Sequence, residues 1–313
     1  MSEWKVLLTD GLEENGQAIL RQFARVDNRS GISAEELLQV VGDYDALIVR
    51  GRTKVTPAVF EAGKNLKVVG RAGVGVDNID LNAAKAKGVT VVNSPTATTI
   101  AVAELTIGLM LAVLREIPRA DAGMKEGKWL KKELEGGELW RKTLGIIGFG
   151  RIGSAVAQRA SAFEMNVIAY DPLRTREEIE QRCGCSSTLD ELLEQSDIIT
   201  VHTPLNDTTR DLINADAFAK MKDGVYFICA ARGGVVNEEA LLAALESGKV
   251  AGAGLDVFAA EPPGITPLVK HPRVVCTPHI GAQTVEAQGR AAEDIASEVL
   301  AALKGEPLRW KVA

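Results

Sequence analysis

Short apolar runs alternate with stretches of helical periodicity along the first 96 residues. The runs "KVLLTD", "DALIVRG", "LKVVGRAG" and "VTVVNSP" are rich in β-branched and large aliphatic residues and end in polar or glycine positions. Between them, segments such as "SAEELLQVVG" repeat apolar residues at helical spacing. Apolar strands that alternate with helices are typical of a parallel sheet covered on both faces. We therefore predict a smaller α/β domain in this part of the chain.

The pattern restarts after residue 97 with a long apolar helix over residues 99–114. Six strand-like runs follow, and six strands make a complete dinucleotide-binding sheet. An amphipathic helix over residues 284–303 follows the last run. The predicted fold class is α/β with two doubly wound parallel sheets, one Rossmann-type and one flavodoxin-like. The six runs are "KTLGIIGFG", "MNVIAYDP", "SDIITVHTP", "GVYFICAARGG", "VAGAGLDVF" and "RVVCTPHIG".

Length and charge narrow the range of partners. A chain of 313 residues suggests about two domains. The formal net charge of −6 and the pI of about 5.4 argue against a nucleic-acid partner. The apolar helix over residues 99–114 is shorter than a membrane span and contains Glu104, so we expect no membrane partner.

The cysteines give no metal-binding pattern. Only Cys183 and Cys185 lie close together, and neither Cys229 nor Cys276 belongs to a second pair. We expect free thiols, no metal site and a reducing compartment. The N-terminal stretch "MSEWKVLLTD" lacks the basic and apolar regions of a signal peptide, so the expected location is cytoplasmic.

Three glycines follow the strand "TLGIIG" with the spacing G-x-G-x-x-G. Gly148 permits a tight turn, Gly150 lets the backbone approach a pyrophosphate, and Gly153 lets the next helix pack closely on the strand. The following helix directs its N-terminal N–H groups towards such a ligand. A tight turn without a ligand is the alternative explanation of the same glycines. The strand before them and the helix after them favour a dinucleotide site.

The cofactor predicted for this loop is NAD. Asp171 ends the next strand, 18 residues after Gly153, where a carboxylate accepts hydrogen bonds from ribose hydroxyls and repels the extra phosphate of NADP. Arg174 and Arg176 lie close by and weaken that preference. A second glycine-containing loop over residues 70–78 has no compact helix start after it, and we interpret it as a ligand-facing loop of the first domain.

Reactive side chains follow several predicted strands of the second domain. Ligands of open α/β sheets bind beyond the carboxyl ends of the strands, where Arg232, Glu261, His202 and His279 are expected. A dehydrogenase needs a group that holds the alcohol proton, and histidine has a suitable pKa. A carboxylate orients that ring, and an arginine binds a substrate carboxylate. By position alone His202 and His279 both qualify, whereas His271 lies in a loop-like stretch.

Several long segments carry a resemblance to a known family. The segments "LGIIGFGRIG", "VHTPLNDTTRDLIN", "ARGGVVNEEALLAALESGKVAGAGLDVFAAEPP" and "TPHIGAQT" resemble the D-isomer-specific 2-hydroxyacid dehydrogenases, in the family's order and over essentially the whole chain. The family's catalytic arginine, glutamate and histidine fall on Arg232, Glu261 and His279. The resemblance thus makes His279 the proton carrier and places His202 beside the cofactor.

The resemblance also implies the ligand contacts. Asp256 is expected near the nicotinamide carboxamide, and three arginines near loop ends suit a substrate that carries phosphate as well as carboxylate. The implied substrate-binding residues are Arg50, Arg52, Arg71, Val74, Gly75 and Asn93. The implied NAD-binding residues are Val74, Gly148, Gly150, Arg151, Ile152, Gly153, Asp171, His202, Thr203, Pro204, Ala230, Ala231, Arg232, Asp256, His279, Gly281 and Ala282.

The architecture that the resemblance implies is discontinuous. Residues 1–96 and 283–313 would form the substrate-binding domain, and residues 97–282 the NAD-binding domain. A homodimer is expected, with the apolar helix at its interface and the segment "KEGKW", ending at Trp129, reaching the neighbouring subunit. We expect no C-terminal regulatory domain, because the sequence stops at "LKGEPLRWKVA".

The first-domain motifs "LIVRGRTKVT" and "LKVVGRAGVGVDNID" are most similar to family members that oxidise 3-phospho-D-glycerate to 3-phosphohydroxypyruvate, the entry to serine synthesis. The expected partner is therefore a small anionic 2-hydroxy or 2-oxo acid. Two alternatives stay open. One is another substrate, such as glyoxylate, hydroxypyruvate or a D-lactate-type acid. The other is an NAD-sensing corepressor, for which we see no peptide-binding extension in the sequence.

Overall fold

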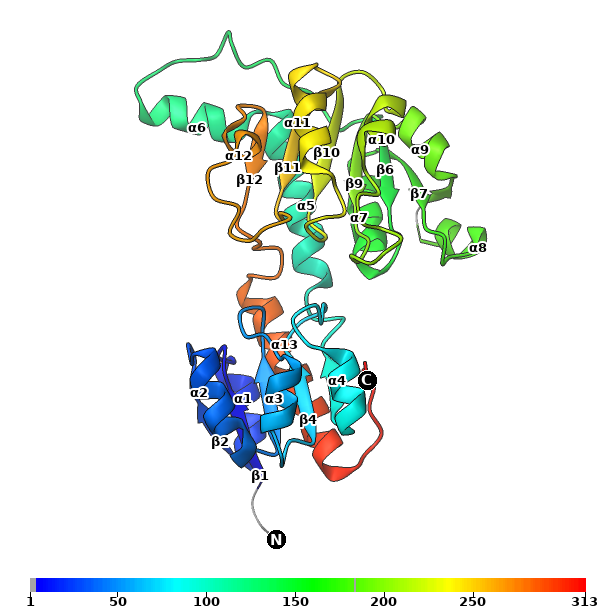
Figure 1. Cartoon of the computed structure of the whole chain (residues 1–313). Helices are drawn as coiled ribbons and strands as arrows, with labels where there is room; N and C mark the ends of the chain where they lie inside the picture. The colour runs from blue at the N-terminus through cyan, green and yellow to red at the C-terminus, as the bar shows by residue number, and fades with distance from the viewer. Residues whose placement is uncertain (1–3, 183) are drawn as a thin grey trace. The chain divides into compact units, whose positions relative to one another are not determined.

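The computed structural model describes residues 4–182 and 184–313, so Cys183 of the predicted cysteine pair lies outside the described residues. The chain divides into two compact units (Figure 1). Unit 1 comprises Met1–Thr98 and Ala282–Ala313, and unit 2 comprises Thr99–Gly281. These divisions lie within two residues of the domain boundaries that we expected at 96/97 and 282/283. The apolar helix over residues 99–114, which we expected at a homodimer interface, starts unit 2.

Unit 1 contains a five-stranded parallel sheet with the order β2-β1-β3-β4-β5. Successive side chains of a strand point to opposite faces. Val6 and Leu8 accordingly join one buried cluster, and Leu7 joins the other. The predicted doubly wound sheet is confirmed, with the flavodoxin-like order. Its strands are β1 (Trp4–Leu8), β2 (Ala24–Asn28), β3 (Ala46–Val49), β4 (Val68–Arg71) and β5 (Thr90–Asn93).

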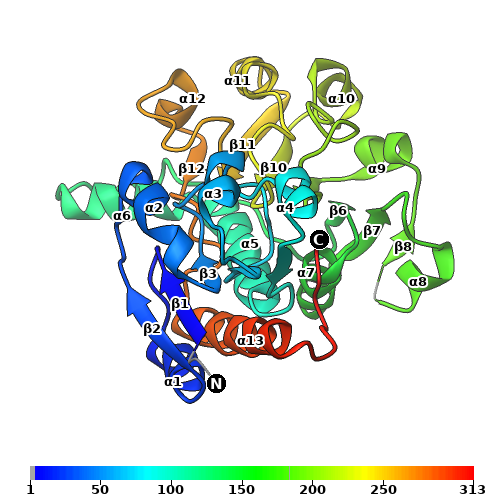
Figure 2. The ribbon, with the colours of Figure 1, turned by 60° about the horizontal axis from the view of Figure 1, so that its bottom comes forward.

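Helices cover both faces of this sheet. Helices α1 and α13 pack side by side on one face, with Cβ-free Gly16 against the backbone of Ala292 (Figure 2). Helices α2, α3 and α4 cover the other face. The last residues pair with β5, since Val91 N–H donates to the Ala313 carbonyl at 2.9 Å. The bounds are α1 (Glu14–Arg21), α2 (Ala34–Val40), η1 (Val41–Asp43), α3 (Pro57–Ala62), α4 (Leu81–Lys87) and α13 (Val285–Lys304).

Unit 2 contains a seven-stranded parallel sheet with the order β12-β11-β10-β9-β6-β7-β8. Six strands coincide with the six predicted runs. The seventh, β8, has only two residues and carries no apolar run. The predicted Rossmann-type sheet is confirmed. Its strands are β6 (Thr143–Ile147), β7 (Asn166–Tyr170), β8 (Cys185–Ser186), β9 (Ile198–Val201), β10 (Val225–Cys229), β11 (Val250–Leu255) and β12 (Val274–Cys276).

The helices of unit 2 divide between the two faces of its sheet. Helices α5 and α7 contribute to one buried cluster, and α9, α10, α11 and α12 contribute to the other. Much of α5 is buried against α7, β10 and β11, which makes it a core helix of this unit. The bounds are α5 (Thr99–Leu114), α6 (Ile117–Lys125), α7 (Arg151–Ala162), α8 (Arg176–Glu180), α9 (Leu189–Gln195), α10 (Ala215–Lys220), α11 (Glu238–Glu246) and α12 (Pro267–Lys270).

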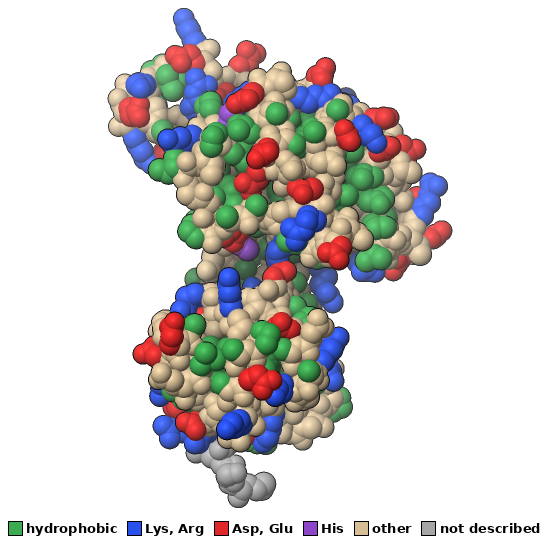
Figure 3. Space-filling model, in the orientation of Figure 1, with side chains coloured by type: hydrophobic (Ala, Val, Ile, Leu, Met, Phe, Trp, Pro, Cys, Tyr) green, Lys and Arg blue, Asp and Glu red, His purple; other side chains and the backbone are tan. Residues whose placement is uncertain are grey.

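Surface charge, helix length and the grouping of possible ligands relate to the expected absence of nucleic-acid, membrane and metal partners. Acidic and basic side chains are interspersed over the face drawn in Figure 3. Among the described residues, no helix is both long and apolar enough to cross a membrane. Within the same residues, no three His, Cys, Asp or Glu side chains gather as metal ligands would.

Candidate active site

The glycine loop of unit 2 connects β6 to α7 beside the point where the strand order reverses, between β6 and β9. Gly148 has a φ of 91°, and a Cβ there would lie 2.8 Å from the backbone of His202. A Cβ on Gly153 would lie 2.2 Å from the Gly148 carbonyl oxygen. Gly150, the residue before α7, has no atom within 4 Å of its Cβ position. The first and third glycines are therefore required by the turn itself, while the second faces open space.

The Asp171 side chain is hydrogen-bonded to the backbone of the glycine loop. Its Oδ2 accepts the Phe149 N–H at 2.8 Å, and its Oδ1 accepts the Leu173 N–H at 2.9 Å. The carboxylate thus lies at the carboxyl end of β7 next to the loop. Arg174 pairs with Glu178 at 3.2 Å, and Arg176 pairs with Glu180 at 2.7 Å, on α8. Both arginines that we expected to weaken the preference for NAD therefore have their own acidic partners.

His202 follows β9 and packs against the glycine loop. Burial lowers the pKa of His202 to about 4, so the ring is neutral at pH 7. Its Nε2 lies 3.1 Å from Thr200 Oγ1, whereas its Nδ1 and the neighbouring Thr203 Oγ1 are buried without a hydrogen-bond partner. A neutral, desolvated imidazole without a carboxylate partner is poorly suited to hold a proton through a reaction.

This burial predicts acid sensitivity. The unfolded chain binds a proton at His202 near pH 6.5, whereas the folded chain binds it only near pH 4. The free energy of unfolding should therefore fall as the pH drops from about 6.5 to 4. Urea unfolding at several pH values should show a shallower fall for His202→Asn than for the unmodified chain. The same acid limb in both proteins would contradict the burial of this ring.

His279 has the partner that His202 lacks. Its Nδ1 lies 2.7 Å from Glu261 Oε2, and both side chains are partly exposed. Glu261 Oε1 accepts the Phe258 N–H at 3.1 Å, which fixes the carboxylate. Because Nδ1 faces the glutamate, Nε2 is the atom left to exchange a proton with a substrate. The geometry is that of a histidine whose charged form is stabilised by a carboxylate.

A buried carboxylate organises the loop that carries His279. Asp256 is 1% exposed and accepts the Ile280 and Gly281 N–H groups, each at 2.8 Å, and the Thr277 hydroxyl at 2.6 Å. His279 itself has a φ of 51°, an unusual backbone conformation for a residue with a side chain. We infer that Asp256 holds the segment 277–281 in this shape. This role was not predicted from the sequence, where the available signal is an acid directly after an apolar strand.

Arg232 lies in the loop that follows β10, the strand next to β11. The strands β10, β11 and β12 are neighbours, so the loops that follow them, with Arg232, Asp256 and His279, meet at one edge. A Cβ on Gly233 would lie 1.8 Å from the Phe258 carbonyl oxygen, so this glycine lets the Arg232 loop contact the Glu261 loop. Arg232 Nη1 also donates to the Ala231 carbonyl at 2.7 Å.

Cys229, at the end of β10, is a buried thiol close to this site. Burial raises the pKa of the Cys229 thiol to about 11, so this thiol is not a nucleophile at neutral pH.

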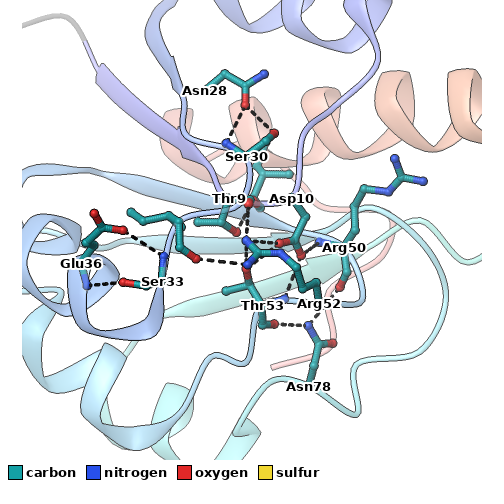
Figure 4. Close-up of polar contacts among 12 residues, drawn as sticks. Thr9, Asp10, Asn28, Ser30, Ser33, Glu36, Arg50, Arg52, Thr53 and Asn78 are labelled. Carbon is teal, nitrogen blue, oxygen red and sulfur yellow. Dashed lines mark hydrogen bonds and ion pairs between the residues drawn. The ribbon is translucent and has the colours of Figure 1, made fainter. Parts of the chain in front are cut away.

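The predicted substrate residues of unit 1 gather at the carboxyl ends of β3, β4 and β5. Arg50 pairs with Glu13 at 3.3 Å and contacts Gln288. Arg52 instead donates to the Thr9 carbonyl at 2.7 Å (Figure 4). The two arginine side chains leave their loop in different directions (Figure 4).

A second loop of unit 1 carries three of the predicted residues. Arg71 lies at the end of β4, and a Cβ on Gly73 would collide with its guanidinium. Asn93 Nδ2 donates to the Val74 carbonyl at 2.7 Å, which fixes the loop that continues to Gly75.

Comparisons with known proteins identify the family to which the chain belongs. Residues 107–281 match the family model described as D-isomer specific 2-hydroxyacid dehydrogenase, NAD binding domain. The chain belongs to this family. The resemblance inferred from the sequence motifs is thereby confirmed.

Individual relatives of this chain carry different names. A D-3-phosphoglycerate dehydrogenase from Archaeoglobus fulgidus is 49% identical over 307 residues, which cover 97% of this chain and 58% of that protein. A hydroxypyruvate reductase from Thermotoga maritima is 46% identical over 303 residues, covering 96% of this chain and 98% of that one. The structure of a glyoxylate reductase from Paecilomyes thermophila matches with 34% identity and a TM-score of 0.91, covering 100% and 99% of the two chains. The chain spans a little over half the length of the phosphoglycerate dehydrogenases that it matches.

The residues of this chain fit the NAD that the family model names. Open space at Gly150, the N-terminus of the 12-residue helix α7 and the buried, unpartnered Thr203 Oγ1 all suit a phosphate-bearing ligand. Asp171 lies beside this loop and remains the predicted acceptor for the ribose hydroxyls. The structure brings most of the predicted cofactor contacts of unit 2 to the carboxyl edge of one sheet, where the rule for open α/β sheets places a dinucleotide.

Proposed function

We propose that this chain catalyses the NAD-linked oxidation of 3-phospho-D-glycerate to 3-phosphohydroxypyruvate and the reverse reduction. The observation that carries the chemistry is the 2.7 Å contact between His279 and Glu261, on loops that also meet the loop of Arg232. The phosphoglycerate dehydrogenases among the relatives support the choice of substrate.

The roles of the side chains follow from their chemistry. When bound, NAD accepts or returns the hydride at C2 of the substrate. Neutral His279 takes the C2 hydroxyl proton at Nε2, and Glu261 stabilises the imidazolium that results. Arg232 binds the substrate carboxylate and polarises the C2 oxygen. Asp256 keeps the His279 loop in place. Arg50 and Arg71, with Val74, Gly75 and Asn93, are proposed to bind the anionic substrate.

A second substrate is supported by one comparison. The hydroxypyruvate reductase relative matches over 98% of its own length, whereas the phosphoglycerate dehydrogenases match over about 56–58% of theirs. An unphosphorylated 2-oxo acid would use the same proton-carrying pair. The two proposals differ only in whether the arginines of unit 1 bind a phosphate.

A direct comparison of substrates separates the two. We expect kcat/KM for NADH-dependent reduction of 3-phosphohydroxypyruvate to exceed that for hydroxypyruvate and glyoxylate by about a hundredfold, or about 2.7 kcal/mol at the transition state. A flat or reversed preference would identify a general hydroxyacid reductase with the same catalytic residues.

Two arginine variants locate the phosphate site. Arg50→Met should raise KM for 3-phosphohydroxypyruvate by about tenfold, since a charge-assisted hydrogen bond contributes about 1.5–3 kcal/mol, and should change KM for hydroxypyruvate much less. Arg52→Ala tests the same prediction for a guanidinium that already binds the carbonyls of Thr9 and Ile32. A rise in KM that is equal for both substrates would remove the arginine concerned from the phosphate site.

A second copy of the chain is the proposed macromolecular partner. Ile117 and Met124 on α6 and Trp129 beyond it are 50%, 58% and 76% exposed, an unusual exposure for large apolar side chains. Since α5 is largely core, we propose that α6 and the segment up to Trp140 contribute the homodimer interface. The thiols of Cys185, Cys229 and Cys276 are free, which suits the proposed cytoplasmic location.

A further inference from the structure

Unit 1 contains a cavity whose lining shares only Arg52 with the residues predicted to bind the substrate. It lies between α2 and α3 and has a volume of about 360 Å³, within the usual range for small-molecule sites. Its wall includes the start of α2 and the loop Arg52–Lys54 that follows β3. Neither Arg50 nor Arg71 lines it.

The lining combines apolar surface with positive charge. Leu37 and Val59 are buried at 2% and 3% exposure, and Leu38 is 39% exposed. Lys54 is exposed and forms no ion pair within residues 4–182 and 184–313. Arg52 is partly neutralised, because its Nη2 lies 3.2 Å from Asp10 Oδ1. The cavity therefore presents about one surplus positive charge next to aliphatic side chains.

One buried carboxylate connects this cavity to Arg50. The side chain of Asp10 is 4% exposed, and its Oδ2 accepts the Arg50 N–H at 2.8 Å and the Thr53 N–H at 3.0 Å. Its Oδ1 accepts the Thr53 hydroxyl at 2.5 Å and pairs with Arg52. On the other side of the loop, Asn78 Nδ2 donates to the carbonyls of Arg50 and Thr53 (Figure 4). The cavity-lining residues Arg52 and Thr53 and the backbone of Arg50 are thus all bound by the Asp10 carboxylate.

We propose that this cavity is an effector site for a small monoanion with an apolar body, coupled to Arg50 through Asp10. The apolar body lies against Leu37, Leu38 and Val59, and the anionic group binds Lys54 and the free N–H donors of Arg52. An anion that draws the guanidinium away from Asp10 leaves this buried carboxylate without its counter-charge, which favours a rearrangement of the loop of Arg50 that it holds. The coupling, though not the binding, rests on the proposed role of Arg50 in substrate binding.

Binding can be measured without any activity. Naphthalene-2-carboxylate, titrated calorimetrically into the full chain with saturating NADH, should bind at one saturable site. Lys54→Met should weaken the binding by about tenfold, as expected for the loss of one charge-assisted hydrogen bond, and Leu38→Asp should also weaken it. Lys64→Met is the matched control, because Lys64 is an exposed lysine of unit 1 outside the cavity.

Two results would overturn the site. One is equal binding to Lys54→Met, Leu38→Asp and the unmodified chain. The other is loss of binding in Arg50→Met, which would show that the probe occupies the substrate site. Both Lys54 and Leu38 are exposed, so these variants should fold normally.

The coupling has its own readout. With saturating naphthalene-2-carboxylate, KM for the preferred 2-oxo acid should rise about threefold or more, with kcat unchanged because the catalytic residues belong to unit 2. Lys54→Met should abolish this rise. Saturable binding with an unchanged KM would overturn the coupling. An absence of all turnover would instead count against the proposed function, and the calorimetric result would still decide the site.

Discussion

Replacing His279 by alanine should lower kcat by about a hundredfold or more while leaving NADH affinity nearly unchanged. The expectation follows from the position of the ring, whose Nδ1 is held 2.7 Å from Glu261 and whose Nε2 is left for the substrate. Without this imidazole, the other histidine at this edge is His202, whose pKa is lowered by burial so that its ring stays neutral. Steady-state kinetics with NADH and the preferred 2-oxo acid, beside calorimetric titration with NADH, would separate turnover from binding.

Glu261→Gln is the companion variant. It preserves the shape of the side chain and removes the charge that stabilises the imidazolium, so kcat should fall by less than in His279→Ala. His202→Asn should retain most of kcat. Unchanged turnover in His279→Ala, or a larger loss in His202→Asn, would contradict the assignment.

Two glycine variants should distinguish the glycines needed for the tight turn from the glycine needed for binding of the pyrophosphate. Gly153→Ala places a Cβ 2.2 Å from a backbone oxygen, so we expect a loss of about 2–3 kcal/mol in the free energy of unfolding of unit 2. Gly150→Ala meets no atom within 4 Å and has an ordinary φ of −75°, so its stability should change by about 1 kcal/mol or less. Its Cβ fills the open space beside the loop, so the affinity for NADH should fall about tenfold or more, because the pyrophosphate must approach that backbone closely.

The control is Gly108→Ala in α5. This glycine also has no atom within 4 Å of its Cβ position, and it lies far along the sequence from the loop. Alanine in the middle of a helix should stabilise it by about 0.5–1 kcal/mol and leave NADH binding unchanged. If Gly150→Ala bound NADH as well as Gly108→Ala does, the loop would be only a tight turn.

Most of the strands that sequence patterns predicted have buried side chains on both faces, although β7 and the edge strand β12 are partly exposed. Central strands such as β6 and β9 are continuous apolar runs, because helices cover the parallel sheet on both sides. The two missed strands are β2 and β8. Strand β2 reads "ARVDN" and lies at a sheet edge with partly exposed side chains, and β8 has two residues. Neither has a local apolar signal, since each is held mainly by pairing with its neighbour.

By itself, the sequence determined the alternation of strands and helices, the glycine loop with its acid after the next strand, and the family. These features are local, because each depends on the spacing of residues within one strand, turn or helix. Only the tertiary structure decided which residues meet. In the folded chain His279 contacts Glu261, and His202 is buried. Asp256 binds the backbone of the loop 277–281, and the Arg52 side chain binds the Thr9 carbonyl and points away from Arg50. The reason is that these contacts join the ends of different strands, and the order of strands in a sheet is not written in any single segment.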